Sequence, residues 1–322
     1  MAPDTASEQE PDLPPAIGEA PISLIGNPHA MNCTPERLEA MRALLGEVAE
    51  VELIATRGRG HATELCRAAA ERGDRLVIVA GGDGTLNEAA NGLAGTATAL
   101  APIPGGCTNV FARSLGIPDD PLEAASRLVG RLARPRIRRV DLGSINDRRF
   151  LFTSQVGFTA EVVKRMHDHT TSRPRIRQMW FLASAVAAAH EHRGAAPTMR
   201  LSAGGRSLDG VGLVAQNSRA LTFMGSREVT LLGGAGLETG SLGVALLRKV
   251  GLETLATLPA MIVAPGGQAS HHPQLETLEA VAEFDVEALA APLHAEVDGD
   301  YIGAFERLRF ASHPGELRVL VP

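Results

Sequence analysis

The feature that most constrains the fold is a buried type of strand that ends in a glycine-rich turn and leads directly into a helix. Leu76–Ala80 is an unbroken apolar run, Gly81-Gly82-Asp83-Gly84 follows it, and Thr85–Leu93 has apolar residues at helical spacing. Unbroken apolar strands are typical of parallel sheets that are covered on both faces. The segment therefore predicts part of a βαβ unit on a parallel sheet.

The same alternation runs through the first part of the chain. The strands expected there are Ile22–Asn27, Val51–Ala55 and Thr98–Pro102, and the helices are Glu36–Val48, His61–Arg72 and about Thr108–Leu115. Beyond about residue 146, β-type runs separated by Gly-rich turns take over. These runs are Phe150–Gln155, Met199–Ser202, Val211–Gln216, Leu242–Leu247, Ala280–Val286 and His294–Val297. Helical segments at Gln178–His190 and Leu252–Val263 interrupt them.

This pattern predicts two domains. We expect an α/β domain over residues 21–145 and a mostly antiparallel β domain over residues 146–322, with residues 1–20 forming a disordered tail. The final strand, Leu317–Val321, can return to either domain.

Composition excludes several classes of protein. The net charge of −6 argues against general nucleic-acid binding, and three cysteines fit neither a zinc site nor a disulfide framework. No uncharged apolar stretch reaches the roughly 18 residues needed to span a bilayer, and the first 20 residues do not have the character of a secretory signal. We expect a cytoplasmic protein. Its arginine-rich segment, residues 127–149, is either an ordinary solvated face or a surface that contacts anionic lipid.

The glycine-rich turn is suited to binding phosphate. Its glycines let the backbone approach a ligand closely, and the free N–H groups at the helix start attract anions. A carboxylate such as Asp83 about 5 Å from a phosphate faces roughly 3 kcal/mol of repulsion per charge pair, so it needs a bridging Mg²⁺ or hydrogen-bond donors. The chain has no P-loop lysine, so phosphate binding must rest on backbone amides, metal and other cations. A tight turn with no ligand is the alternative.

A second turn of the same kind follows the next strand. Pro104-Gly105-Gly106 leads to Thr108 and Asn109 at another expected helix start. Since the carboxyl ends of parallel strands meet at one edge of a sheet, both turns can converge on one nucleotide. Asn27 and Thr56 follow the first two strands and point to the same edge.

A third constellation, Glu296-Val297-Asp298-Gly299-Asp300, lies far downstream at a strand end. Two carboxylates flanking a glycine are compatible with a plain hairpin turn. They are also compatible with a general base that takes the proton from an acceptor hydroxyl across from the nucleotide.

Together these segments resemble the diacylglycerol kinase catalytic family, which also contains sphingosine and ceramide kinases and soluble bacterial lipid kinases. The matching segments run in family order over most of the chain. They are Asn27-Pro28, Thr56, Gly81 to Glu88, Pro104 to Arg113, Leu115 to Pro118, Gly157-Phe158 and Asp298 to Asp300. The resemblance implies an N-terminal α/β nucleotide-binding domain, of the type shared by NAD kinases and diacylglycerol kinases, and a C-terminal antiparallel β-sandwich that covers lipid. It also implies ATP and Mg²⁺ as cofactors.

Carried over by position, the resemblance implies a set of ATP-binding residues: Asn27, Thr56, Gly81, Gly82, Asp83, Gly84, Thr85, Leu86, Asn87, Thr108 and Asn109. It implies Asp300 as the catalytic base, in the place of the family's glutamate, with Asp298 the next candidate. Where family members often hold a structural Mg²⁺ through a carboxylate, this chain has Thr239, and we assign no metal site.

The expected function is transfer of the γ-phosphate of ATP to a lipid hydroxyl, with diacylglycerol the first candidate and phosphatidic acid the product. Such a protein would contact the membrane peripherally, and a homodimer is compatible with the sequence. Two alternatives stay open. One is a lipid-binding or regulatory homologue without turnover, suggested by departures from the family at His29, Cys107, Thr239 and Asp300. The other is an NAD kinase, which shares the Gly-Gly-Asp-Gly turn but carries a separate Asn-Glu pair downstream, whereas here the pair is Asn87-Glu88.

Overall fold

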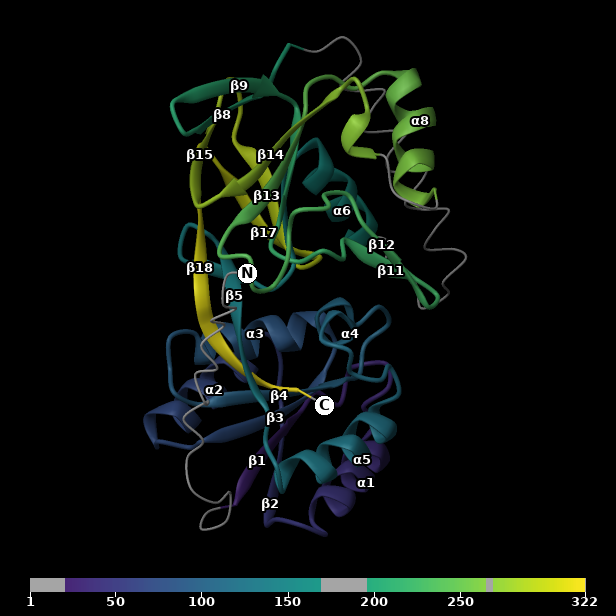
Figure 1. Ribbon diagram of the computed structural model, residues 1–322, viewed down its shortest axis with the longest axis vertical. Coiled ribbons are helices and arrows are strands. Elements are labelled where there is room, and N and C mark those ends of the chain that lie inside the picture. The colour runs from purple at the N-terminus through teal and green to yellow at the C-terminus, as the bar shows by residue number, and fades with distance from the viewer. Residues whose placement is uncertain (1–20, 169–195, 265–268, 322) are drawn as a thin grey trace, which may run out of the picture.

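The computed structural model describes residues 21–168, 196–264 and 269–321. The tail expected at residues 1–20 and the helix expected at Gln178–His190 lie outside the described residues. An α/β domain and a β domain are stacked along the long axis of the molecule (Figure 1). The expected combination of these two domain types is therefore present.

The core of the α/β domain is a parallel sheet with strand order β2-β1-β3-β4. Its strands are β1 (Ile22–Gly26), β2 (Val51–Ala55), β3 (Leu76–Gly81) and β4 (Ala99–Pro104). The helices are α1 (Pro35–Leu45), α2 (His61–Glu71), α3 (Asp83–Leu93), α4 (Val110–Ser114) and α5 (Pro121–Leu132). Helix α1 packs against α5, and α2 packs against α3. Because helices cover the sheet, every residue of β3 and β4 is buried.

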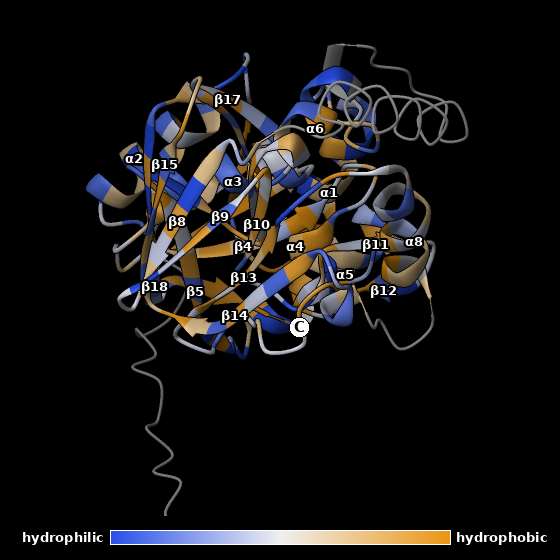
Figure 2. Ribbon diagram, turned by 90° about the horizontal axis from the view of Figure 1, so that it is seen from above, coloured by the Kyte–Doolittle hydropathy of each residue, from blue (hydrophilic) through white to orange (hydrophobic). Residues whose placement is uncertain are grey.

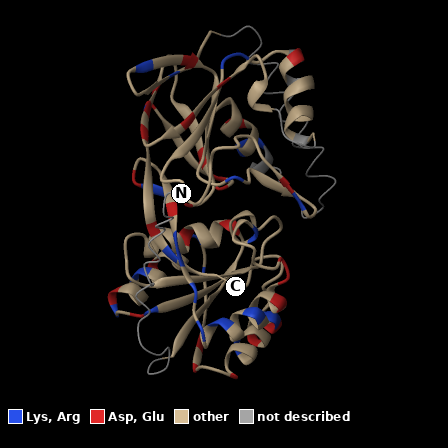
Figure 3. Cartoon of the chain, in the orientation of Figure 1, with Lys and Arg blue, Asp and Glu red and all other residues tan. Residues whose placement is uncertain are grey.

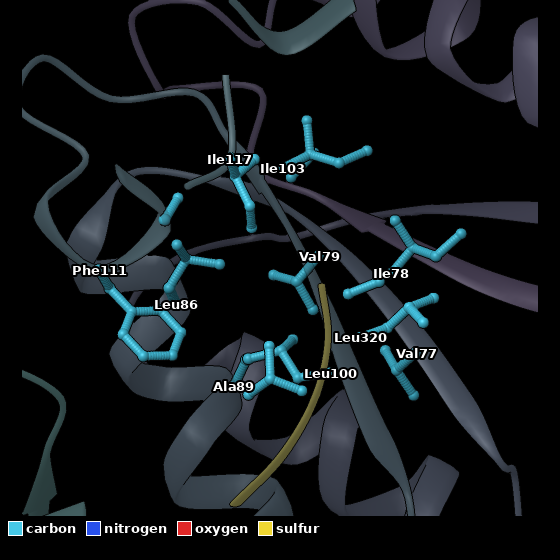
Figure 4. Packing of buried hydrophobic residues seen from close by; sticks show 14 of the residues in the cluster. Val77, Ile78, Val79, Leu86, Ala89, Leu100, Ile103, Phe111, Ile117 and Leu320 are labelled. Atoms are coloured by element: carbon cyan, nitrogen blue, oxygen red, sulfur yellow. The ribbon is translucent and has the colours of Figure 1, made fainter. Parts of the chain in front are cut away.

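Apolar side chains fill the space between sheet and helices. Val79 of β3, Leu86 of α3 and Phe111 of α4 belong to one buried cluster (Figure 4). Hydrophobic residues are concentrated on the central strands, while the peripheral elements carry more hydrophilic residues (Figure 2). This burial fixes α3 and α4 against the sheet, so the turns in front of them have fixed positions as well.

The β domain is a sandwich of two sheets. One layer contains β5 (Ile137–Ile145), β6 (Arg148–Phe150), β8 (Met199–Ala203), β9 (Arg206–Gly210), β15 (Glu283–Ala288) and β18 (Arg307–Leu320). The other has the order β14-β13-β10-β7-β16-β17. Its strands are β7 (Thr153–Gly157), β10 (Gly212–Gln216), β13 (Leu242–Leu247), β14 (Leu275–Val281), β16 (Leu293–Val297) and β17 (Asp300–Phe305). Phe284 and Phe310 of the first layer stack with ring centroids 4.5 Å apart and share a core with Val156 and Ala295 of the second.

The 14-residue strand β18 joins the two domains. Its first half pairs with β15, and Arg318 and Val319 pair in parallel with Ala99 and Leu100 of β4. Strand β5 lies antiparallel along its other side. The sheet of the α/β domain therefore continues without a break into one layer of the sandwich (Figure 1).

The remaining helices and strands belong to the β domain but lie outside its two main sheets. They are the helices α6 (Phe158–Asp168) and α8 (Leu252–Val263), the short 3₁₀ helix η1 (Ala269–His271), and a hairpin of β11 (Thr222–Met224) and β12 (Arg227–Val229). Among the described residues, no helix combines the length and apolar character needed to cross a membrane.

Candidate active site

The loops that follow β1, β2 and β4 are hydrogen-bonded to the ends of strands β1 and β3 at the carboxyl edge of the parallel sheet. The backbone N–H of Asn27 donates to the Ala80 carbonyl at 2.9 Å, and that of Thr56 donates to the Gly26 carbonyl at 2.8 Å. The N–H of Gly105 donates to the Gly81 carbonyl at 2.7 Å. The structure thus brings together the loops in which the sequence placed a nucleotide site.

The two glycine turns touch through their backbones. A Cβ on Gly106 would lie 2.7 Å from the Cα of Gly82, and a Cβ on Gly82 would lie 3.2 Å from the Cα of Gly106. Both distances are shorter than ordinary van der Waals contacts, and both involve backbone atoms. Glycine is therefore required at these positions by the neighbouring loop, in addition to any ligand.

Asp83 joins the first turn to the helix that follows the second. Its carboxylate accepts the backbone N–H groups of Val110 at 3.1 Å and Phe111 at 3.2 Å, at the start of α4. Burial raises the pKa of Asp83 to about 6, although the backbone N–H donors lower it. A carboxylate at this position was expected to need either a bridging Mg²⁺ or hydrogen-bond donors. The protein itself supplies the hydrogen-bond donors.

Several of the residues expected to bind ATP have side chains turned into the protein. Leu86 is part of the hydrophobic core (Figure 4). The Asn27 side-chain amide donates to the Thr85 hydroxyl at 2.9 Å, and Thr85 and Thr56 are both buried. Gly82, Gly84 and Thr108 remain partly accessible. The accessible surface at this edge is therefore mostly backbone.

Asn109 fixes the shape of the second turn. It has a left-handed backbone with φ 51°, and its side-chain oxygen accepts the Gly106 N–H at 2.8 Å. Its side-chain amide donates to the Gly106 carbonyl at 3.1 Å and to Asp119 at 2.8 Å. The buried Asn109 side chain thus has its hydrogen bonds within the protein.

Asp298 is buried at the end of β16 and accepts four hydrogen bonds. One carboxylate oxygen accepts the backbone N–H groups of Phe152 at 2.9 Å and Thr153 at 3.1 Å. The other accepts the Leu151 N–H and the Asn87 side-chain amide, both at 2.7 Å. Burial raises the pKa of Asp298 to about 6, and these donors oppose that rise. The carboxylate therefore holds the strand end in place, and its lone pairs are occupied.

Asp300, two residues later, is arranged differently. Its side chain is 29% exposed, and its carboxylate oxygen lies 3.4 Å from the point where a Cβ on Gly84 would stand. The acid therefore reaches from the β domain to the first turn of α3. It also pairs with Arg59, whose Nη2 is 3.3 Å from Oδ2 of Asp300.

Two buried acids support this arrangement. Glu88 accepts the N–H groups of Gly60 at 2.7 Å and Ala62 at 3.2 Å, which fastens the loop before α2 to α3. Glu296 accepts the Gly299 N–H at 2.7 Å, and its Oε1 has no hydrogen-bond partner among the described residues. Complete burial raises the pKa of Glu296 to about 8, and the charge of Asp298 adds to the rise.

No motif marks Arg59, and its contact with Asp300 depends on the fold. The two residues are far apart in the sequence, and nothing in the Thr56 to Gly60 segment indicates a partner in the second domain. The only available signal was the general need for a cation near phosphate in a chain without a P-loop lysine.

The turn where family members often hold a structural Mg²⁺ does not fit a metal here. The Thr239 hydroxyl donates to the Gly236 carbonyl at 3.0 Å, and Asp141 accepts the N–H groups of Gly240 at 2.6 Å and Gly315 at 2.8 Å. Within the described part of the chain, no three His, Cys, Asp or Glu side chains are grouped so that they could hold a metal ion. Backbone donors occupy the Asp141 carboxylate, and the neighbouring Glu238 pairs with Arg138, so we derive no role for a metal in this turn.

A cavity of about 560 Å³ lies elsewhere, in the β domain. It is lined by residues of β8, β9 and β13, including Leu208 and Leu246, together with Arg248 and Lys249. Neither the glycine turns nor Asp300 contribute to its lining. The candidate site is therefore defined by the converging loops rather than by this cavity.

Comparison with known proteins finds a family that matches the α/β domain. Residues 21–145 match the family of the diacylglycerol kinase catalytic domain. These residues therefore resemble the diacylglycerol kinase catalytic family. The resemblance expected from the sequence motifs is thus confirmed over this part of the chain.

Two curated relatives in this family match part of the chain. A diacylglycerol kinase of Bacillus subtilis is 45% identical over 105 residues, which is 32% of this chain and 33% of that protein. A Chromohalobacter salexigens protein named "Probable lipid kinase YegS-like" is 36% identical over 140 residues, which is 41% of this chain and 44% of that protein. The matches span less than half of the relatives' length.

The fold extends over almost the whole chain. A crystal structure described as a diacylglycerol kinase from Bacillus anthracis superposes with a TM-score of 0.69 at 19% identity, covering 94% of this chain and 97% of that one. At this identity the likeness concerns the fold. The expected fold class is thereby confirmed for both domains.

Proposed function

We propose that this protein is an ATP-dependent lipid kinase that transfers the γ-phosphate of ATP to a lipid hydroxyl, with diacylglycerol the first acceptor to test. The match of residues 21–145 to the diacylglycerol kinase catalytic domain supports kinase chemistry, and the names of the two relatives support a lipid acceptor. The single observation that carries the proposal is the position of the Asp300 carboxylate beside Gly84, at the start of α3.

The chemistry follows from that position. The N–H groups at the start of α3 form a site for phosphate oxygens, because a helix N-terminus carries unpaired donors and positive potential. The Asp300 carboxylate then lies beside the bound phosphates and can take the proton of an acceptor hydroxyl. The hydroxyl oxygen forms a bond to the γ-phosphorus, the bond to the bridging oxygen breaks, and ADP leaves. Mg²⁺ would enter with the nucleotide and offset its charge.

The two carboxylates of the Asp298-Gly299-Asp300 turn have separate roles in this proposal. Asp298 already accepts four hydrogen bonds in a buried position, so it has little capacity to accept another proton from a substrate. Asp300 is partly exposed and has a side-chain partner in Arg59. We therefore assign the base to Asp300 and the support of its turn to Asp298.

The NAD kinase alternative is weakened because Asn87-Glu88 is not a separate pair downstream of the turn and already has partners within the protein. Asn87 donates to Asp298, and Glu88 binds the N–H groups of Gly60 and Ala62. The one Asn-Glu pair of the chain is therefore engaged in holding the protein together.

The test is transfer of labelled γ-phosphate from ATP, with Mg²⁺, to lipids in mixed micelles. The panel contains diacylglycerol, ceramide, a sphingoid base, monoacylglycerol and a prenol. We expect one lipid to be labelled by the unaltered protein, and Asp300→Asn to reduce the rate by about 10²- to 10⁴-fold, as expected for loss of a general base. Binding of ATP should persist in the variant.

Asp209→Asn is the matched control. Asp209 also pairs with an arginine, Arg200, at 2.8 Å, but it lies on β9 of the β domain rather than at the glycine turns. This variant should keep the full rate. If ATP binds and no lipid is labelled, the regulatory alternative replaces the kinase.

Peripheral membrane contact belongs to the same proposal, since a kinase with a bilayer lipid as acceptor must reach the membrane surface. Sedimentation with vesicles that contain anionic lipid tests it. Binding that weakens with added salt would support a role for the arginine-rich segment.

A further inference from the structure

Arg59 makes an ion pair across the two domains. It lies in the loop between β2 and α2, and its Nη2 is 3.3 Å from Oδ2 of Asp300. The same nitrogen donates to the Tyr301 carbonyl at 3.5 Å. Both partners belong to β17, so this guanidinium connects the edge of the parallel sheet to the strand that carries the proposed base.

The backbone beneath Arg59 is fixed, whereas its side chain is free to change partner. Gly60, the next residue, is bonded through its N–H to Glu88 of α3 and has φ 84°. The Arg59 side chain is 64% exposed. An exposed ion pair contributes little net stability, so a stronger anion nearby can replace Asp300 as the partner.

A phosphate at the start of α3 would be such an anion. It would lie beside the Asp300 carboxylate, which repels it, and the chain has no P-loop lysine to compensate. Two other arginines near these loops are already engaged. Arg148 donates to the Asn87 side chain, and Arg113 donates to the Gly225 carbonyl and lies over the Phe223 ring.

We propose that Arg59 is a ligand of the ATP phosphates, and that Asp300 is its partner only when no nucleotide is bound. This proposal rests on the proposed function. When ATP binds, the guanidinium moves from Asp300 to the terminal phosphate oxygens, where its planar fork can form paired, charge-assisted hydrogen bonds. The carboxylate of Asp300 is then free to accept the hydroxyl proton. Availability of the base is thereby coupled to the presence of ATP.

The experiment measures the affinities of Mg-ATP and adenosine by calorimetry, without any lipid. Arg59→Gln is made in the unaltered protein and in the Asp300→Asn background. Loss of a charge-assisted hydrogen bond should weaken ATP binding by about tenfold in both backgrounds, with adenosine affinity unchanged. Arg57→Gln is the matched control, because Arg57 is exposed in the same loop and carries the same charge. It should bind ATP normally.

Three results would overturn the assignment. A loss of ATP affinity only where Asp300 is present would mean that Arg59 merely neutralises that carboxylate. An equal loss for adenosine would mean that the loop itself is disturbed. Unchanged ATP affinity would mean that Arg59 does not touch phosphate. A protein that binds ATP through Arg59 but labels no lipid would remove the kinase proposal and leave this assignment in place.

Discussion

The side-chain amide of Asn87 donates to the carboxylate of Asp298 at 2.7 Å, across 211 positions of sequence. Asn87 belongs to α3, directly behind the first glycine turn, and Asp298 belongs to the turn between β16 and β17. This bond ties the two domains together next to the place where Asp300 meets Gly84. The geometry of the proposed catalytic step therefore depends on a buried contact made by other residues.

Replacing Asp298 by Asn should destabilise the protein. Each carboxylate oxygen accepts two N–H groups, so an amide nitrogen in place of either oxygen would face two donors without an acceptor. Asn tolerates the φ of 48° at this position, so the backbone is not the cause. We expect a loss of roughly 3 kcal/mol or more in the free energy of unfolding, measured by urea denaturation. Asp300→Asn, made in parallel, should change stability by less than about 1 kcal/mol.

Glu296 should make stability fall as pH rises. Its pKa is raised from 4.5 to about 8 in the folded protein, so between these values the folded state keeps a proton that the unfolded state has lost. Its contribution is complete below pH 4.5 and is lost as pH passes 8. The slope can reach about 1.4 kcal/mol per pH unit.

The window from pH 6 to 8 isolates this residue from Asp83 and Asp298, whose pKa values are raised only to about 6. Glu296→Gln should flatten the dependence there, and Glu287→Gln, at an exposed ion pair, should not. If stability changed with pH at the same slope in the unaltered protein, Glu296→Gln and Glu287→Gln, Glu296 would be ionised in the folded protein.

A methyl group on Gly106 should separate the two glycine turns. Its Cβ would stand 2.7 Å from the Cα of Gly82, and neither backbone can move without disturbing the start of a helix. We expect Gly106→Ala to lower stability by about 1–3 kcal/mol and to weaken ATP binding. Gly130→Ala in α5 is the control, because a Cβ there meets nothing within 4 Å. It should be neutral or stabilise by up to about 1 kcal/mol. Normal ATP affinity in Gly106→Ala would argue against phosphate binding at this contact.

Cys107 should react with thiol reagents much faster than the other two cysteines. It is exposed in the second glycine turn, whereas Cys33 and Cys66 are buried. Burial raises the pKa of the Cys33 thiol to about 11 and that of Cys66 to about 12, so neither forms appreciable thiolate at pH 8. Mass spectrometry should detect one fast adduct, absent in Cys107→Ser. Mg-ATP should slow its formation, and an unchanged rate would place the nucleotide away from this turn.

Sequence patterns located elements well where glycines and polar residues bound an apolar run. The expected segments Val51–Ala55, Leu242–Leu247 and Leu252–Val263 coincide with β2, β13 and α8. The single strand expected over Ala280–Val286 is wrong, because these residues belong to two strands, β14 and β15, and the chain passes from one sheet to the other between them. Strand β14 belongs to one layer and β15 to the other. Ala280 has φ 55°, a conformation that nothing in the local sequence indicates.

The arginine-rich segment shows why ion-pair partners that are distant in the sequence cannot be predicted from a sequence pattern. Arg149 forms an ion pair with Glu316 at 2.7 Å, and Arg138 pairs with Glu238 at 2.6 Å. Basic and acidic residues lie side by side around α1 and α5 (Figure 3). The segment is divided among α5, β5 and β6, so its charges do not form one continuous stretch. Contact with anionic lipid stays a prediction for its exposed members.

The sequence predicted a candidate site of four loops at one edge of the sheet. This was possible because the carboxyl ends of parallel strands always meet at one edge, so each loop could be placed from its own strand. The different environments of Asp298 and Asp300, on which their proposed roles depend, could not be predicted from the sequence. It depends on three N–H groups of residues 151–153, which lie far away in sequence and carry no motif. The contact between Arg59 and Asp300 could not be predicted for the same reason.

Strand β18 also bears on how proteins of this kind can diversify. The region that matches the diacylglycerol kinase catalytic domain ends at residue 145, yet β4 within it pairs on its outer side with β18, Arg307–Leu320. A fragment cut at residue 145 would leave β4 as an open edge that invites association with other chains. A sandwich transplanted from a relative would have to bring a final strand that fits the recipient's β4. Under the proposed function, a change of acceptor would therefore arise more readily by substitution within the sandwich than by exchange of whole domains.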